Sequence, residues 1–191
     1  MRAAAEPATP RPRIALPARL RLLAAAGLAL LVPQATLAQQ AYEVKGAFLF
    51  KFLSYVEWPD DALAGPHTPL VIGVLGDEDV RGALQDIVQG RQAQGRSVEV
   101  RRVKAGDAPE GLHMLFAGRD SVPELARYAG RRGLLLVGDS DDGLARGAMI
   151  NLVLAENRVR FEIAPEAAER AGLRISSRML ALAQVVRPGA S

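Results

Sequence analysis

The 191-residue chain contains no cysteine, which excludes a thiol nucleophile, a cysteine-based zinc or iron–sulfur site, a disulfide and a cysteine-linked lipid anchor. It contains only two histidines, so we expect no multi-histidine metal site. These two absences lead us to predict that the protein uses no metal and no cofactor.

Motifs of catalysis and nucleotide binding are also missing. No Gly-Lys-Ser/Thr follows Gly76, which excludes a P-loop, and Gly73–Gly76 lacks the third glycine of a dinucleotide-binding loop. Neither Gly-x-Ser-x-Gly nor His-Glu-x-x-His occurs. We therefore predict no catalytic residues and a protein that is not an enzyme, while a hydrolase whose triad assembles across the fold, using His113 or Ser177, stays open as a minor alternative.

The positive charge of the chain is concentrated at its start. Residues 1–21 contain five arginines and one glutamate, the apolar run Leu22–Val32 follows, and Thr36-Leu37-Ala38 is a small-x-small cleavage site. This order predicts a secretory signal peptide over residues 1–38, cleaved after Ala38. The remaining residues 39–191 carry 19 basic and 20 acidic side chains, a net charge of −1 in place of +3.

A near-neutral exported chain is not expected to bind nucleic acid, because such proteins keep a basic face. The apolar run Leu22–Val32 would be about 16 Å long as a helix, roughly half of a bilayer core. No second apolar run of about 18 residues follows. We therefore expect a periplasmic protein whose mature chain has no membrane span and forms a single domain over residues 39–191.

Strand and helix patterns alternate along the mature chain, which favours an α/β fold with a mostly parallel central sheet flanked by helices. A β-hairpin near the C-terminus should be followed by two short helices. The expected strands are 70–75, 98–103, 112–117 and 134–137, with the hairpin at 149–154 and 158–163. The expected helices are 41–57, 79–89, one beginning at Ser121, 165–171 and 176–186.

Six of the nine aromatic residues lie between positions 42 and 58. Phe48, Phe52 and Tyr55 fall on one broad arc of the first helix and are expected in the core. Phe50 and Trp58 do not fit this arc, so each is either a core residue or an exposed anchor for a partner. His113 lies in an apolar strand, where we expect a buried histidine that is hydrogen-bonded.

Anion binding could arise at two places. The turn at Gly76 precedes a helix whose free N–H groups could hold an anion. The strand 158–163 places Arg158, Arg160 and Glu162 on one face, which either is solvated or binds a carboxylate or phosphate. The acidic run Asp139–Gly143 lacks the last glutamate of a calcium loop and is expected to cap a short helix.

Several motifs in order make the chain resemble the YfiR family of periplasmic proteins. The first is Lys45–Pro59, an aromatic helix that ends in Val-Glu-Trp-Pro. The others are Val71–Gly76, Gly95-Arg96, Gly147–Ile150, Val159–Ile163 with Ala167-Ala168, Ala171-Gly-Leu173 and Ile175–Leu180. Together they extend over residues 41–186.

The resemblance implies a periplasmic α/β protein, often a homodimer, that represses an inner-membrane diguanylate cyclase by binding the periplasmic sensing domain of that enzyme. Loss of repression would raise cyclic di-GMP and promote biofilm growth. The disulfides of the best-known members have no counterpart here, so control through thiols of this chain is excluded. The candidate partner-binding residues are Phe50, Glu57, Trp58 and Pro59.

The alternative function is a periplasmic module that binds a small anionic ligand, such as a nucleotide or a cell-wall fragment. Its core would be Gly76, Arg96 and Arg160. The full set of candidate ligand-binding residues is Gly76, Arg96, Arg158, Arg160, Glu162, Ser176, Ser177 and Arg178.

Overall fold

The structure is a computed structural model, and it describes residues 33–63, 65 and 67–186. Most of the predicted signal peptide lies outside these residues. The chain divides into two units, Met1–Leu37 and Ala38–Ser191, and the second contains the whole β-sheet. Within the described residues, no helix combines the length and apolar composition that crossing a bilayer requires.

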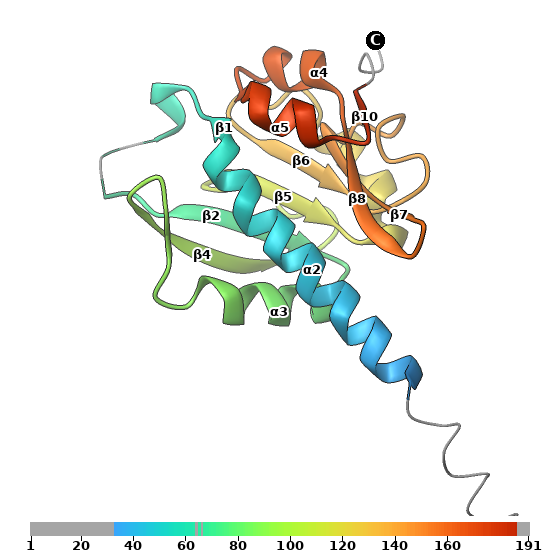
Figure 1. Cartoon of the computed structure of the whole chain (residues 1–191). Helices are drawn as coiled ribbons and strands as arrows, with labels where there is room; N and C mark the ends of the chain where they lie inside the picture. The colour runs from blue at the N-terminus through green and yellow to red at the C-terminus, as the bar shows by residue number, and fades with distance from the viewer. Residues whose placement is uncertain (1–32, 64, 66, 187–191) are drawn as a thin grey trace, which may run out of the picture. The chain divides into compact units, whose positions relative to one another are not determined.

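An eight-stranded sheet forms the centre of this second unit (Figure 1). Its strands, in spatial order, are β10 (Val185–Val186), β8 (Arg158–Ile163), β7 (Ile150–Ala155), β6 (Leu135–Gly138), β5 (Met114–Ala117), β2 (Leu70–Leu75), β4 (Arg96–Val103) and β3 (Gln92–Ala93). The five strands from β7 to β4 are mutually parallel. Their order, with the first strand between the second and third, is that of a doubly wound α/β sheet. The predicted fold class is confirmed.

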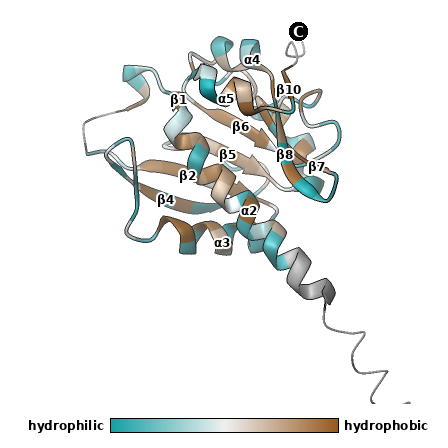
Figure 2. Cartoon of the chain, viewed as in Figure 1, coloured by the Kyte–Doolittle hydropathy of each residue, from teal (hydrophilic) through white to brown (hydrophobic). Residues whose placement is uncertain are grey.

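The apolar runs of the sequence form the middle of the sheet. Every residue of β2, β5 and β6 is buried, as expected for parallel strands covered on both faces. Figure 2 shows these strands in the hydrophobic colour, while the tip of the β7–β8 hairpin is hydrophilic. The tip residues Glu156 and Asn157 both have positive φ, as a two-residue type I′ turn requires. The predicted hairpin is confirmed.

In the described part of the chain, six helical segments accompany the sheet. They are α2 (Pro33–Tyr55), α3 (Glu78–Val88), α4 (Pro165–Arg170), α5 (Ser177–Leu182) and the 3₁₀ segments η1 (Asp60–Ala62) and η2 (Arg119–Tyr128). Asp77 caps α3 as predicted, accepting a hydrogen bond from the Val80 amide at 3.0 Å. The two short helices expected after the hairpin, α4 and α5, are also present.

α2 crosses one face of the sheet and packs against β8 and α3 (Figure 1). Leu49, Phe52 and Leu53 are fully or almost fully buried. The rings of Phe48 and Phe52 lie 5.5 and 5.3 Å from the ring of Phe161 in β8. Burial of each such side chain is worth about 1.5–3 kcal/mol, so this aromatic cluster holds the helix on the sheet.

Several local expectations are wrong, and three of them concern where helices begin and end. The first helix ends at Tyr55, because Val56 and Glu57 form strand β1, which pairs antiparallel with β9 (Arg174–Ile175). Ser121 lies inside η2 and does not begin a helix. The last helix ends at Leu182, because Val185 and Val186 form β10 on the edge of the sheet. In the first and last cases a long-range strand pairing overrides the local helical pattern.

Candidate functional site

The segment Glu57–Pro59, predicted to bind a partner, is anchored on the body of the protein by its tryptophan. Trp58 is only 7% exposed, and its Nε1 donates a hydrogen bond to the His113 carbonyl oxygen at 3.2 Å. The expectation of an exposed Trp58 anchor is therefore wrong. The side chain lies inside because the backbone is extended here and successive side chains alternate: Val56 is buried, Glu57 is exposed and Trp58 is buried again.

The other predicted partner-binding residues keep some exposure. Glu57 is exposed and forms an ion pair with Arg174 at 3.1 Å. Pro59 is half-buried. Phe50 is also half-buried on α2, with the guanidinium of Arg91 6.0 Å from the ring centroid, at the outer limit of a cation–π contact.

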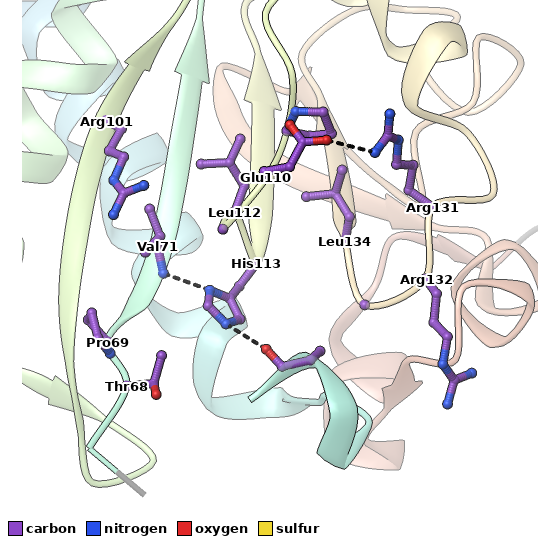
Figure 3. Close-up of a pocket in the computed structure, with 14 residues that line it drawn as sticks. Thr68, Pro69, Val71, Arg101, Glu110, Leu112, His113, Arg131, Arg132 and Leu134 are labelled. Atoms are coloured by element: carbon purple, nitrogen blue, oxygen red, sulfur yellow. Dashed lines mark hydrogen bonds and ion pairs between the residues drawn. The ribbon is translucent and has the colours of Figure 1, made fainter. Parts of the chain in front are cut away.

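His113 links three segments that are distant in the sequence (Figure 3). Its Nδ1 accepts a hydrogen bond from the Val71 amide at 3.1 Å, and its Nε2 lies 3.1 Å from the Ala62 carbonyl oxygen. Because Nδ1 is an acceptor, the proton of the neutral ring is on Nε2 and is donated to Ala62. Burial lowers the pKa of His113, and the positive charges of Arg96 and Arg101 act in the same direction. The prediction of a hydrogen-bonded core histidine is confirmed.

A cleft of about 480 Å³ opens beside His113, at the amino ends of β2, β5 and β6. Its apolar wall includes Val71, Leu112 and Leu134. Leu112 can lie across the sheet because Gly73 has no side chain: an added Cβ would lie 2.8 Å from the Leu112 Cδ1. The cleft therefore has an apolar floor built by side chains of adjacent strands.

Three arginines line the same cleft: Arg101, Arg131 and Arg132. Each forms an exposed ion pair, with Glu99 at 3.0 Å, Glu110 at 3.3 Å and Asp61 at 2.9 Å respectively. Hydrogen bonding to Arg132 lowers the pKa of Asp61. Glu110 is the only acidic side chain among the lining residues described, so the lining carries two more positive than negative charges.

The opposite edge of the sheet, where a doubly wound fold usually binds its ligand, is closed by direct contacts. A Cβ on Gly76 would overlap the Ser121 hydroxyl, and one on Gly118 would lie 2.8 Å from the Asp77 Cβ. Gly76 itself has φ of +75°, a conformation that only glycine adopts at little cost. The turn after β2 is therefore packed against the turn after β5 and leaves no room for a nucleotide between them.

Lys45 and Asp139 form an ion pair at this closed edge, with 2.5 Å between Nζ and Oδ2. Burial raises the pKa of Asp139, and the hydrogen bond from Lys45 opposes that change. The segment after Asp139 forms turns in place of the short helix we expected. Asn151, fully buried on β7, holds this segment by donating to the Ser140 carbonyl at 2.7 Å.

The structure does not bring the predicted anion-binding core together. Gly76 follows the carboxyl end of β2, whereas Arg96 begins the parallel neighbour β4 at the amino end, so about 26 Å of strand lies between them. Arg160 lies on β8, four strand positions from β2, or roughly 19 Å across the sheet. Arg96 also donates hydrogen bonds to the carbonyls of Gly65 and Thr68, which is a structural role.

The remaining candidate ligand residues are dispersed as well. Arg158 and Arg160 are exposed on β8, as the predicted alternation of its faces requires, and Glu162 is half-buried near the Asn151 amide. Ser176 caps α5 by accepting a hydrogen bond from the Met179 amide at 3.3 Å. Ser177 and Arg178 are exposed in the first turn of that helix.

Comparison with known proteins identifies the family of this chain. The sequence model of the YfiR/HmsC-like family matches residues 42–184, most of the chain. The chain belongs to the YfiR/HmsC-like family. The matched region includes the Glu57–Pro59 segment, the cleft beside His113 and the Lys45–Asp139 pair. No curated protein matches the sequence.

The arginines of the cleft are the residues that the sequence analysis missed. They lie in β4 and in the turn before β6, about thirty positions apart, with no motif around them. The signal that could have indicated them is the pair Arg131-Arg132 next to a buried strand, but an exposed turn accounts for such a pair equally well.

Proposed function

We propose that this YfiR/HmsC-like protein is a periplasmic regulator that represses an inner-membrane diguanylate cyclase by binding its periplasmic sensing domain. The observation that carries the proposal is the family match over residues 42–184. Cleavage of a signal peptide after Ala38 would release the regulator into the periplasm. Repression would lower the output of cyclic di-GMP.

The surface we propose for the partner comprises Phe50, Glu57 and Pro59. Phe50 lies near the end of α2, and Glu57 and Pro59 follow within four residues of the last helical residue, Tyr55. Trp58 serves this surface indirectly, because its buried indole fixes the positions of Glu57 and Pro59 on either side of it. A rigid presentation of this kind lowers the entropic cost of binding.

Repression requires only that the protein bind the inactive conformation of the cyclase better than the active one. Binding then shifts the conformational equilibrium of the enzyme without any chemical step. A shift from mostly active to mostly inactive needs a differential affinity of about 10⁴. No catalytic group is needed on the regulator.

The test uses purified mature chain added to inner-membrane vesicles that contain the cyclase, with the periplasmic side outward. We expect cyclic di-GMP production to fall. Phe50→Ala should weaken this repression about tenfold or more, because aromatic anchors dominate interface energetics. The control is Lys51→Ala, since Lys51 is an exposed neighbour on the same helix.

Thermal unfolding of both variants separates an interface role from a core role, because Phe50 is half-buried. A loss of repression with little loss of melting temperature supports the proposal. Unchanged repression by Phe50→Ala contradicts the proposed surface. Failure of the wild-type chain to alter cyclic di-GMP production contradicts the proposed function.

A further inference from the structure

We propose that the cleft beside His113 binds a small amphipathic anion, with an apolar body and one carboxylate or phosphate group. This inference goes beyond the regulatory function and does not rest on it. It is carried by the size of the cleft, by its apolar floor and by the arginines at its rim (Figure 3).

The size and lining fit a small ligand. A volume of about 480 Å³ lies within the usual range for small-molecule sites, which is roughly 300–1,000 Å³. The half-buried side chains of Leu112, Pro69 and Ala62 offer apolar surface to the body of the ligand, and Val71 and Leu134 are buried behind them. The strands behind them belong to the rigid middle of the sheet, so the site is formed before the ligand arrives.

The charge of the lining selects an anion. Arg101 and Arg131 stand on opposite sides of the cleft, with Leu112 and Leu134 between them in Figure 3. Their present ion pairs with Glu99 and Glu110 are exposed, and exposed pairs are worth only about 0–1 kcal/mol. A ligand carboxylate that is partly shielded from water can therefore displace them and gain charge-assisted hydrogen bonds.

His113 limits what the ligand can be. Both of its ring nitrogens already have hydrogen-bond partners, at Val71 and Ala62, and burial holds the ring neutral. The histidine therefore presents only its ring surface to the cleft and adds neither a charge nor a free donor. The arginines therefore recognise the anionic group of the ligand, and apolar side chains contact its body.

The experiment compares two probes of the same shape that differ by one charge, 2-naphthoate and 2-naphthamide, by titration of the ¹⁵N-labelled mature chain. We expect 2-naphthoate to shift the amide signals of Leu112, His113 and Leu134. Because the naphthamide lacks the charge, it should bind the same place at least fivefold more weakly.

The decisive variant is Arg101→Gln/Arg131→Gln. It should lower the affinity for 2-naphthoate about tenfold and leave the affinity for 2-naphthamide unchanged. The matched control is Arg102→Gln/Arg127→Gln, two exposed arginines outside the cleft, which should leave both probes unchanged. Signal dispersion in the spectra verifies that each variant is folded.

Three results would overturn the inference: no shifts at the cleft, shifts that map to another surface, or equal naphthoate affinity in the decisive variant. Each of these leaves repression of the cyclase unaffected, since that assay contains neither probe. Loss of repression with intact naphthoate binding would in turn contradict only the regulatory proposal.

Discussion

At the scale of single residues, His113 shows how one buried polar group can organise several segments. Its ring and its carbonyl oxygen contact Val71, Ala62 and Trp58, which lie 42, 51 and 55 positions away. Removing one partner would leave buried polar groups without hydrogen bonds, at a cost of about 1–3 kcal/mol each. The neutral state of this ring is therefore part of the folded structure.

The lowered pKa of His113 predicts a specific dependence of stability on pH. Below about pH 6.5 the histidine of the unfolded chain takes up a proton, whereas the buried histidine of the folded chain resists protonation. The free energy of unfolding therefore decreases as the pH is lowered below this value. Above about pH 6.5 both states hold a neutral His113, and the group no longer makes the free energy of unfolding depend on pH. Urea unfolding should show a lower free energy of unfolding at pH 5.5 than at pH 7.5, and part of that loss should be attributable to this group.

The control is His113→Gln, which can accept from Val71 and donate to Ala62 but does not titrate. Its stability should be lower than that of the wild type at pH 7.5 and should change less between the two pH values. A pH dependence identical to that of the wild type would show that His113 does not resist protonation in the folded chain.

At the scale of elements, α2 is held on the sheet at two places, by apolar packing at one and by an ion pair at the other. Its apolar face packs on Phe161 of β8, and Lys45, nearer its start, pairs with the buried Asp139 after β6. Gly46 allows α3 to approach, because a Cβ there would lie 3.1 Å from the Ile87 side chain. The aromatic helix is thus a structural element of the fold along most of its length.

The Lys45–Asp139 pair is suited to a double-mutant cycle. Lys45→Met or Asp139→Leu alone should destabilise the protein by about 2–4 kcal/mol, because each leaves a shielded charge without its partner. The double variant should cost no more than the worse single variant, since apolar side chains then face each other. Urea unfolding at pH 7 measures all three free energies.

Arg174→Gln provides the comparison, because it removes an exposed pair with Glu57 and should cost less than about 1 kcal/mol. If the loss of unfolding free energy in the Lys45→Met/Asp139→Leu variant equals the sum of the losses in the two single variants, the two side chains do not stabilise each other. The anchoring of α2 would then rest on the aromatic cluster alone.

At the scale of the whole molecule, the two ends of the parallel sheet differ in kind. At the carboxyl end, the turns after β2 and β5 are packed against each other at Gly76 and Gly118, and Lys45 pairs with Asp139 after β6. The amino end carries the open cleft with its arginines. A doubly wound sheet usually binds ligands at the carboxyl end, so this protein reverses the common arrangement if the cleft is occupied as we propose.

The predicted leader can be tested on the intact protein. Gln39 and Gln40, the first two residues after the predicted cleavage point, are exposed, and the first buried residue between positions 39 and 55 is Gly46. We expect the exported protein to have the mass of residues 39–191. That chain, expressed without the leader, should unfold in a single cooperative transition. A periplasmic mass equal to the full chain would contradict cleavage.

Much of the architecture could be predicted because it depends on local signals. Apolar runs bounded by glycine predicted β2, β5 and β6, and the capping residue Asp77 predicted the start of α3. The hairpin followed from alternation on both sides of a short turn. The sequence analysis missed the short strands β1, β3, β9 and β10. A strand of two residues is too short to show an alternating pattern, and its backbone becomes extended only where a partner strand is present.

The sequence by itself determined the α/β class, the strands of the core, the hairpin and a family resemblance, because each depends on neighbours along the chain. Only the tertiary structure decided that Trp58 faces inward, that Gly76, Arg96 and Arg160 lie apart, and that Lys45 meets Asp139 across 94 positions. It also placed Arg101 on one side of a cleft whose other side carries Arg131. Such contacts depend on strand order, which is set by burial of the whole sheet and leaves no pattern within any one segment.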